Sequence, residues 1–200
     1  MEEKQLNEKE SLEVISNMIK ATQNRFTQNA GAPFLVWGYT TVLSSIAVWF
    51  AMVRTGNYWW NMLWFLIPII SFPVMMIYNR KQESGAKTYV DSVINKIWIV
   101  FGSVGFLVSL VAMFGGYINM QLPILFIVIL LMGMGTTLTG MVMKFLPCTI
   151  GGALAILLSF LCLIVHNWNV CLIFAAVFVV MMVIPGHILN CKGKCDAKRA

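Results

Sequence analysis

Six long apolar blocks limit what this chain can fold into. They occupy residues 33–53, 59–78, 97–114, 122–143, 146–165 and 170–189. The hydrocarbon core of a membrane is about 30 Å thick, and roughly 20 apolar residues in an α-helix cross it. Between Pro33 and Asn190 the chain has only eight charged residues, and all of them lie between the blocks. We therefore expect an all-α, polytopic membrane protein with six transmembrane helices arranged as three hairpins.

The division between the fourth and fifth blocks is the shortest. Only Met143, Lys144 and Phe145 separate them, and Pro147 follows at once. A single segment over residues 122–165 would be far longer than a membrane is thick. A lysine followed closely by a proline favours a tight turn at this point. Six spans is the prediction, and five spans is the alternative.

The composition excludes several classes of protein. Apolar residues make up 59% of the chain and charged residues 11%, whereas a soluble domain has about 25% charged residues. A soluble enzyme, a disordered protein and a disulfide-stapled secreted domain are therefore excluded. No charged residue lies in the middle of a block, and no phosphate-binding or catalytic motif occurs. We expect no enzymatic activity and no cofactor.

The distribution of basic residues predicts the orientation. With the N-terminus in the cytoplasm, thirteen of the fourteen Lys and Arg residues lie in inner segments, and Arg54 alone lies outside. Cytoplasmic loops carry this excess of basic residues, so both termini are predicted to be cytoplasmic. The net charge of +6 then indicates contact with anionic lipid rather than binding of nucleic acid.

The first 32 residues are predicted to form a cytoplasmic amphipathic helix, ahead of a transmembrane domain (33–190) and a basic cytoplasmic tail (191–200). The helix should cover residues 8–28, with a stop at residues 29–31. Its apolar stripe can dock on the protein itself, on lipid headgroups or on another protein. The residues of this candidate partner face are Leu12, Ile15, Ile19 and Phe26.

Hydroxyl and small residues are frequent within the blocks. Four small-x-x-x-small pairs predict close helix packing: Ala47/Ala51, Gly105/Ser109, Thr136/Gly140 and Gly151/Ala155. The hydroxyls either satisfy carbonyls of their own helices or line a path for a small neutral or amphipathic ligand. The candidate path residues are Tyr39, Thr40, Ser44, Thr136 and Thr137.

One cluster has the chemistry of a metal site. His187, Cys191 and Cys195 recur every four residues, and imidazole with two thiolates suits Zn²⁺ or Cu(I). Gly186 and Gly193 are expected to interrupt the helix, and no fourth ligand is evident. We therefore expect no metal site here, and keep the three residues only as weak candidates.

Three stretches carry a resemblance. Residues 33–39 (PFLVWGY), 60–68 (WNMLWFLIP) and 184–190 (IPGHILN) resemble small, uncharacterised bacterial multi-pass membrane proteins of a domain-of-unknown-function type. The resemblance implies a bacterial inner-membrane location and lends no activity.

The expected function is therefore a non-enzymatic membrane protein that engages a cytosolic or membrane partner, as a sensor, regulator or assembly subunit. The partner can be a second copy of the chain. The alternative is a small permease or lipid-handling protein whose ligand site lies among the hydroxyl-bearing spans. Nothing in the sequence identifies a substrate or a partner.

The charge bias gives a test of topology. We expect cysteine reporters placed after Arg54, Tyr117 and His166 to react with a membrane-impermeant reagent added from outside. Reporters at Glu83 and at the C-terminus should react only after the membrane is opened. Labelling of Glu83 from outside would contradict the six-span arrangement.

Overall fold

The computed structural model describes residues 8–81, 89–118, 123–165 and 167–197. Within these ranges the chain is helical apart from short turns, and it contains no strand. The helices are α1 (Glu8–Thr55), α2 (Leu66–Lys81), α3 (Tyr89–Ile118), α4 (Ile124–Val142), α5 (Leu146–Ser159), α6 (Leu161–Ile164), α7 (Val170–Phe178) and α8 (Ile184–Ala197). A 3₁₀ segment (Tyr58–Phe65) precedes α2, and a π-helical segment (Val179–Val183) joins α7 to α8.

Six stretches are long and apolar enough to cross a membrane, which confirms the predicted number of spans. They are Gly31–Thr55, Trp59–Tyr78, Val90–Ala112, Ile124–Val142, Leu146–Ile164 and Val170–Lys192. The third span begins seven residues before the predicted position at residue 97. Asp91 and Lys96 do not delay it, because charges in the first turns of a membrane helix reach the polar interface.

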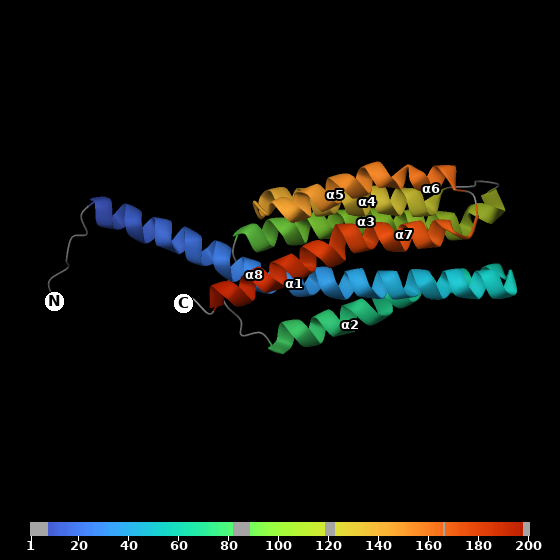
Figure 1. Ribbon diagram of the computed structural model, residues 1–200, viewed down its shortest axis with the longest axis horizontal. Coiled ribbons are helices and arrows are strands. Elements are labelled where there is room, and N and C mark those ends of the chain that lie inside the picture. Colours follow the sequence, from blue (N-terminus) through green and yellow to red (C-terminus); the bar gives the residue numbers. More distant parts are fainter. Residues whose placement is uncertain (1–7, 82–88, 119–122, 166, 198–200) are drawn as a thin grey trace.

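Four of the spans form the core of the bundle, and two lie at its periphery. The core consists of α1, α4, α5 and the sixth span, which comprises α7, the π-helical segment and α8. In Figure 1, α2 runs along α1 on one side, and α3 lies with α4 and α5 on the other. Ser71 is the only buried residue of Trp59–Tyr78, and no residue of Val90–Ala112 is buried. The second and third spans are thus attached to the core by one face each.

Close backbone contact joins α1 to the sixth span. A Cβ atom on Gly31 would lie 3.0 Å from the backbone nitrogen of Asn190 and 3.1 Å from the carbonyl oxygen of Gly186. Two turns further along α1, a Cβ atom on Gly38 would lie 3.0 Å from Cγ2 of Val183. Glycines seven residues apart share one face of a helix, so this face of α1 lets the two helices approach closely.

The contact between α4 and α5 has the same basis. A Cβ atom on Gly140 would lie 2.9 Å from the carbonyl carbon of Cys148, and one on Gly152 would lie 2.6 Å from the nitrogen of Thr137. A Cβ atom on Gly133, seven residues before Gly140, would lie 3.1 Å from the carbonyl oxygen of Gly152. These separations leave no room for a side chain, so glycine is required where the two backbones meet.

Two of the four predicted small-residue pairs lie in the core. Thr136/Gly140 and Gly151/Ala155 are buried. Ala47 is exposed, and a Cβ atom on Gly105 would have no neighbour within 4 Å. The prediction of close packing is therefore wrong for Gly105/Ser109, because no helix approaches Gly105 closely. Ala47 and the half-buried Ala51 lie outside the buried core.

The predicted turn between the fourth and fifth spans is confirmed. Lys144 has a positive φ of 53°. The backbone N–H of Phe145 donates to the carbonyl of Gly140 at 2.9 Å, and that of Lys144 donates to Met141 at 3.1 Å. This hydrogen-bond pattern is a Schellman motif with a lysine at the position that usually holds glycine. It reverses the chain in three residues and brings α5 back along α4.

The π-helical segment lies directly before Pro185. Proline has no N–H and cannot continue the α-helical pattern, and the N–H of Ile184 donates instead to the carbonyl of Val179, five residues back. On α5, a Cβ atom on Gly151 would lie 3.0 Å from the carbonyl oxygen of Val180 and 3.3 Å from Cγ of Pro185. The widened turn is therefore packed against a glycine of α5.

The predicted N-terminal helix is present, but the predicted stop at residues 29–31 is wrong. Helix α1 runs without a break from Glu8 to Thr55, with Pro33 inside it. Gly31 does not end the helix, because it is needed for the close contact with α8. The expected division at residue 32 therefore falls inside one continuous helix. We refer to residues 8–30, which precede the first span, as the arm of α1.

The glycine contacts generate a matched test. We expect Gly140→Ala to destabilise the protein by about 1–3 kcal/mol, because the new methyl group would overlap the backbone of α5. Gly105→Ala should cause no loss of stability, because its methyl group would meet nothing within 4 Å. Thermal unfolding in detergent measures both. Equal stability of the two variants would contradict the α4–α5 packing.

Candidate functional site

The side-chain hydroxyls of the α4 threonines donate hydrogen bonds to backbone carbonyls of their own helix. Thr136 Oγ1 donates to the carbonyl of Met132 at 2.8 Å, and Thr137 Oγ1 donates to the carbonyl of Gly133 at 2.7 Å. The backbone of α5 at Gly152 fills the space beside Thr137. These two candidate path residues therefore lie in a packed helix contact rather than beside a channel.

The hydroxyls of α1 serve a different contact. Thr40 Oγ1 lies 2.7 Å from the carbonyl oxygen of Val36 and 2.8 Å from Oγ of Ser71 on α2. The rings of Trp37 and Phe72 meet edge to face beside this pair, with centroids 5.4 Å apart. Ser44 is buried one turn further along α1. Together these contacts attach α2 to the core.

The predicted path residues are thus divided between two interfaces. Thr40 faces α2, whereas Thr136 and Thr137 belong to α4, and Thr137 faces α5. The structure does not bring the two sets together. Ser71 was not among the predicted path residues, although it is a hydroxyl residue between Pro68 and Pro73 in a mostly apolar span.

Tyr39, the remaining path residue, pairs with His187. Its hydroxyl lies 2.7 Å from Nε2 of the histidine, and the two rings meet edge to face with centroids 5.9 Å apart. Both side chains are exposed on the outside of the α1–α8 contact. Sequence analysis selected each residue for a different role and did not foresee the pair.

The weak metal candidates share a helix but do not form a metal site among the described residues. The expected interruption is wrong, because α8 continues through Gly186 and Gly193. Nε2 of His187 is occupied by Tyr39. In the described part of the chain no group of three histidine, cysteine or acidic side chains is gathered, and the side chain of Cys195 lies outside that part.

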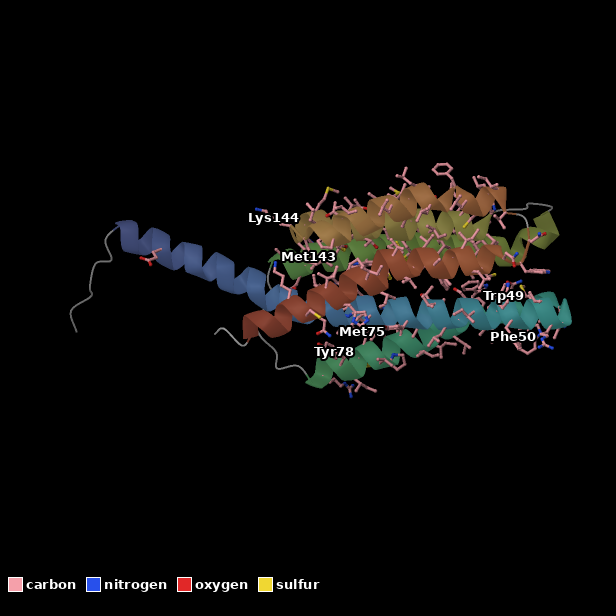
Figure 2. The ribbon with its side chains drawn as sticks, in the orientation of Figure 1. Trp49, Phe50, Met75, Tyr78, Met143 and Lys144 are labelled. Carbon is pink, nitrogen blue, oxygen red and sulfur yellow. The ribbon has the colours of Figure 1, made fainter. Side chains whose placement is uncertain are left out.

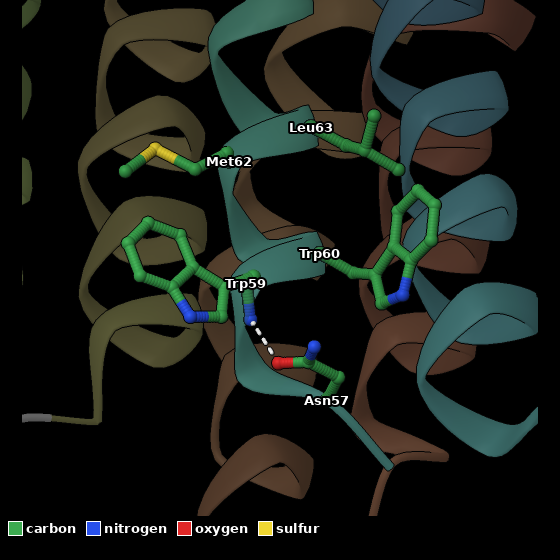
Figure 3. Close-up of a pocket in the computed structure, with 5 residues that line it drawn as sticks. All are labelled: Asn57, Trp59, Trp60, Met62 and Leu63. Atoms are coloured by element: carbon green, nitrogen blue, oxygen red, sulfur yellow. Dashed lines mark hydrogen bonds between the residues drawn. The ribbon is translucent and has the colours of Figure 1, made fainter. Parts of the chain in front are cut away.

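A shallow hollow of about 320 Å³ lies beside the 3₁₀ segment. Asn57, Trp59, Trp60, Met62 and Leu63 line it. Figure 3 shows that the two indole rings lie on different sides of the segment, and that Oδ1 of Asn57 accepts a hydrogen bond of 3.1 Å from the backbone N–H of Trp59. The hollow is open and mostly apolar, and tryptophans are frequent at the ends of membrane-spanning segments.

The charged residues of the spans divide between the two ends of the bundle. Arg54 lies at one end and contacts the Phe50 ring, its guanidinium carbon 5.3 Å from the centroid. The basic end, as we call the other, carries exposed Arg80, Lys96, Lys144 and Lys192. In Figure 2, Lys144 and Tyr78 lie toward the basic end, while Trp49 and Phe50 lie toward the opposite end.

The arm of α1 projects from the basic end. At a rise of 1.5 Å per residue its 23 residues are about 34 Å long. Figure 1 shows most of the arm extending beyond the ends of the other helices. The candidate partner-face residues, Leu12, Ile15, Ile19 and Phe26, lie within this projecting helix. Their side chains are outside the described part of the structure.

The bundle and its two chemically different ends define a polytopic, all-helical membrane protein. Comparison with models of protein families, with curated proteins and with solved structures gives no match for the chain. The resemblance to small bacterial membrane proteins therefore stays a prediction.

The Thr40–Ser71 contact can be tested against the ligand-path interpretation. We expect Thr40→Val to destabilise the protein by about 1 kcal/mol, because a hydrogen bond between two membrane helices is lost. Ser103→Ala is the control, since the exposed Ser103 bonds only within its own helix, at 2.9 Å to Val100. Thermal unfolding in detergent measures both. Unchanged stability of Thr40→Val would contradict a packing role.

Proposed function

We propose that the chain is a non-enzymatic integral membrane protein that engages a protein partner through the arm of α1. The supporting observation is that the arm continues the first span as one unbroken helix beyond the bundle. It is thus a rigid extension of a core helix, placed outside the membrane domain. A sensor, a regulator or an assembly subunit uses an extension of this kind.

We propose that the arm lies in the cytoplasm of a bacterial cell and that the bundle lies in its inner membrane. The gathering of Arg80, Lys96, Lys144 and Lys192 at the basic end supports this orientation, because cytoplasmic segments hold the basic residues of membrane proteins. The C-terminal end of α8 is at the same end, so both termini are cytoplasmic in this arrangement.

The direction of the arm favours a protein over the membrane surface. An amphipathic helix binds lipid when it lies in the plane of the interface. Figure 1 shows the arm inclined to the rest of α1 but projecting beyond the end of the bundle. This direction carries Leu12, Ile15 and Ile19 away from the headgroups. An apolar stripe held in water gains stability when another protein covers it.

The alternative, a permease or a lipid-handling protein, requires hydroxyls that are available to a ligand. Thr136 and Thr137 donate to their own helix, and Thr40 bonds to Val36 and to Ser71. These contacts favour packing as the role of the hydroxyls, so the arm gives the better-supported function.

Paired charge substitutions test the proposal. We expect the double variant Ile15→Asp/Ile19→Asp to lose its partner, because carboxylates on the apolar stripe cannot be buried. The matched control is Asn17→Asp/Asn24→Asp, which adds the same charge on the opposite side of the helix. Both full-length variants are expressed in membranes, and the proteins that co-purify in mild detergent are identified.

The outcomes separate a partner face from self-docking. Loss of co-purifying protein in the first variant alone, with thermal stability unchanged, supports the proposal. A large drop in the stability of the isolated protein indicates that the stripe docks on the protein itself. Retention of every partner by both variants overturns the role of the arm.

A further inference from the structure

Four apolar residues of the arm, together with Thr22, follow a specific spacing. Leu12, Ile15, Ile19, Thr22 and Phe26 are separated by three, four, three and four residues. This is the spacing of the a and d positions of a coiled coil, in which helices pack along an apolar seam. Leu12, Ile19 and Phe26 occupy a positions, and Ile15 and Thr22 occupy d positions. The seam therefore runs over two full heptads with a single polar residue.

We propose that a second copy of this chain covers the seam, so that the arms of identical chains form a parallel coiled coil at the basic end. The inference rests on the proposed function, because it names the partner of the arm. Two copies inserted in the same direction project their arms to the same side of the membrane. Their seams are then parallel and in register without any rearrangement of the bundles.

The residues beside the seam favour a second copy over a different protein. In coiled coils, charged pairs at the e and g positions select the partner. Here these positions hold Lys9, Ser11, Ser16, Met18, Gln23 and Arg25. The charged residues Glu13 and Lys20 fall at b positions, away from the seam. Identical arms therefore meet with little repulsion, and no charge pattern specifies another chain.

The same positions disfavour a lipid surface. Helices that bind anionic membranes carry lysines and arginines on the flanks of their apolar stripe. Among the e and g positions of the arm, Lys9 and Arg25 are basic, and the others hold uncharged residues. Together with the direction of the arm, this composition favours another helix over a lipid surface as the binding partner of the seam.

The register of α1 relates the seam positions to the contacts of the first span. Eighteen residues make five full turns, so Ile19 lies above Trp37 and Phe26 lies above Ser44. Trp37 packs against Phe72 of α2, whereas the close contact with α8 uses the Gly31 side of α1. By this register the seam positions fall on the face of α1 that contacts α2 lower down, and not on the face that meets α8. In a dimer the α2 helices, in which Ser71 is the only residue described as buried, flank the common axis.

Site-specific crosslinking tests the seam in the full-length chain. Single cysteines replace Ile15 (d) or Ile19 (a), and the control is Asn17→Cys at the f position. Cys191 and Cys195 are replaced by serine so that they do not contribute. Membranes are oxidised mildly, and the dimer is measured on a non-reducing gel. A disulfide needs Cα atoms within about 7 Å, which a and d positions provide and f positions do not.

We expect several-fold more crosslinked dimer for Ile15→Cys and Ile19→Cys than for Asn17→Cys. Copies with two different affinity tags are co-expressed as a second measurement. They should co-purify, and Ile15→Asp/Ile19→Asp should abolish their co-purification, whereas Asn17→Asp/Asn24→Asp should not.

The remaining outcomes separate this inference from the proposed function. If the tags co-purify equally in both double variants, the copies associate through their spans and the seam is not the interface. If the tags do not co-purify but Ile15→Asp/Ile19→Asp loses another protein, the inference fails and the proposed function stands. If neither association nor crosslinking depends on the arm, and Ile15→Asp/Ile19→Asp also retains every other co-purifying protein, both fail.

Discussion

Close approach of helix backbones is the constraint on which this bundle depends. In a membrane the lipid is as apolar as the side chains, so helices associate through packing and hydrogen bonds rather than through the hydrophobic effect. Gly31 and Gly38 bring α1 against the sixth span, and Gly140 and Gly152 bring α4 against α5. Gly151 then joins these two pairs by packing against the π-helical segment. The peripheral α2 and α3 are attached to this four-helix core.

The same constraint explains how α1 both packs in the bundle and extends beyond it. Gly31 was expected to end a helix, but here it contacts the backbone of α8 and the helix continues. The arm is consequently an extension of a core helix, not a separate element on a linker. Any protein bound to the arm would be connected directly to the α1–α8 contact and to the neighbouring Tyr39–His187 pair.

Much of the fold could be predicted from the sequence, because membrane thickness sets the length of each apolar block. The number of spans and the turn at Lys144 followed from block length and from the lysine and proline near the boundary. The extents of α1 and α3 did not follow from these features. Local preferences assigned Gly31 to a helix stop and Asp91 to a loop before the third span. In the structure Gly31 makes a close helix contact, and Asp91 lies in the first turns of α3, where the membrane interface can solvate it. The prediction for the small-residue pairs failed where no helix faces them, as at Gly105.

For the candidate site, the sequence identified the residue types but not their neighbours. It selected Tyr39, Thr40, Thr136 and Thr137 as one hydroxyl set, and the structure divides them among contacts with His187, Ser71 and α5. The sequence by itself determined the six spans, the concentration of basic residues at one end and the heptad spacing of the arm. These features follow from composition and period along the chain. Only the tertiary structure decided which helices meet, which hydroxyls are occupied and where α1 ends, because each of these depends on residues far apart in the sequence.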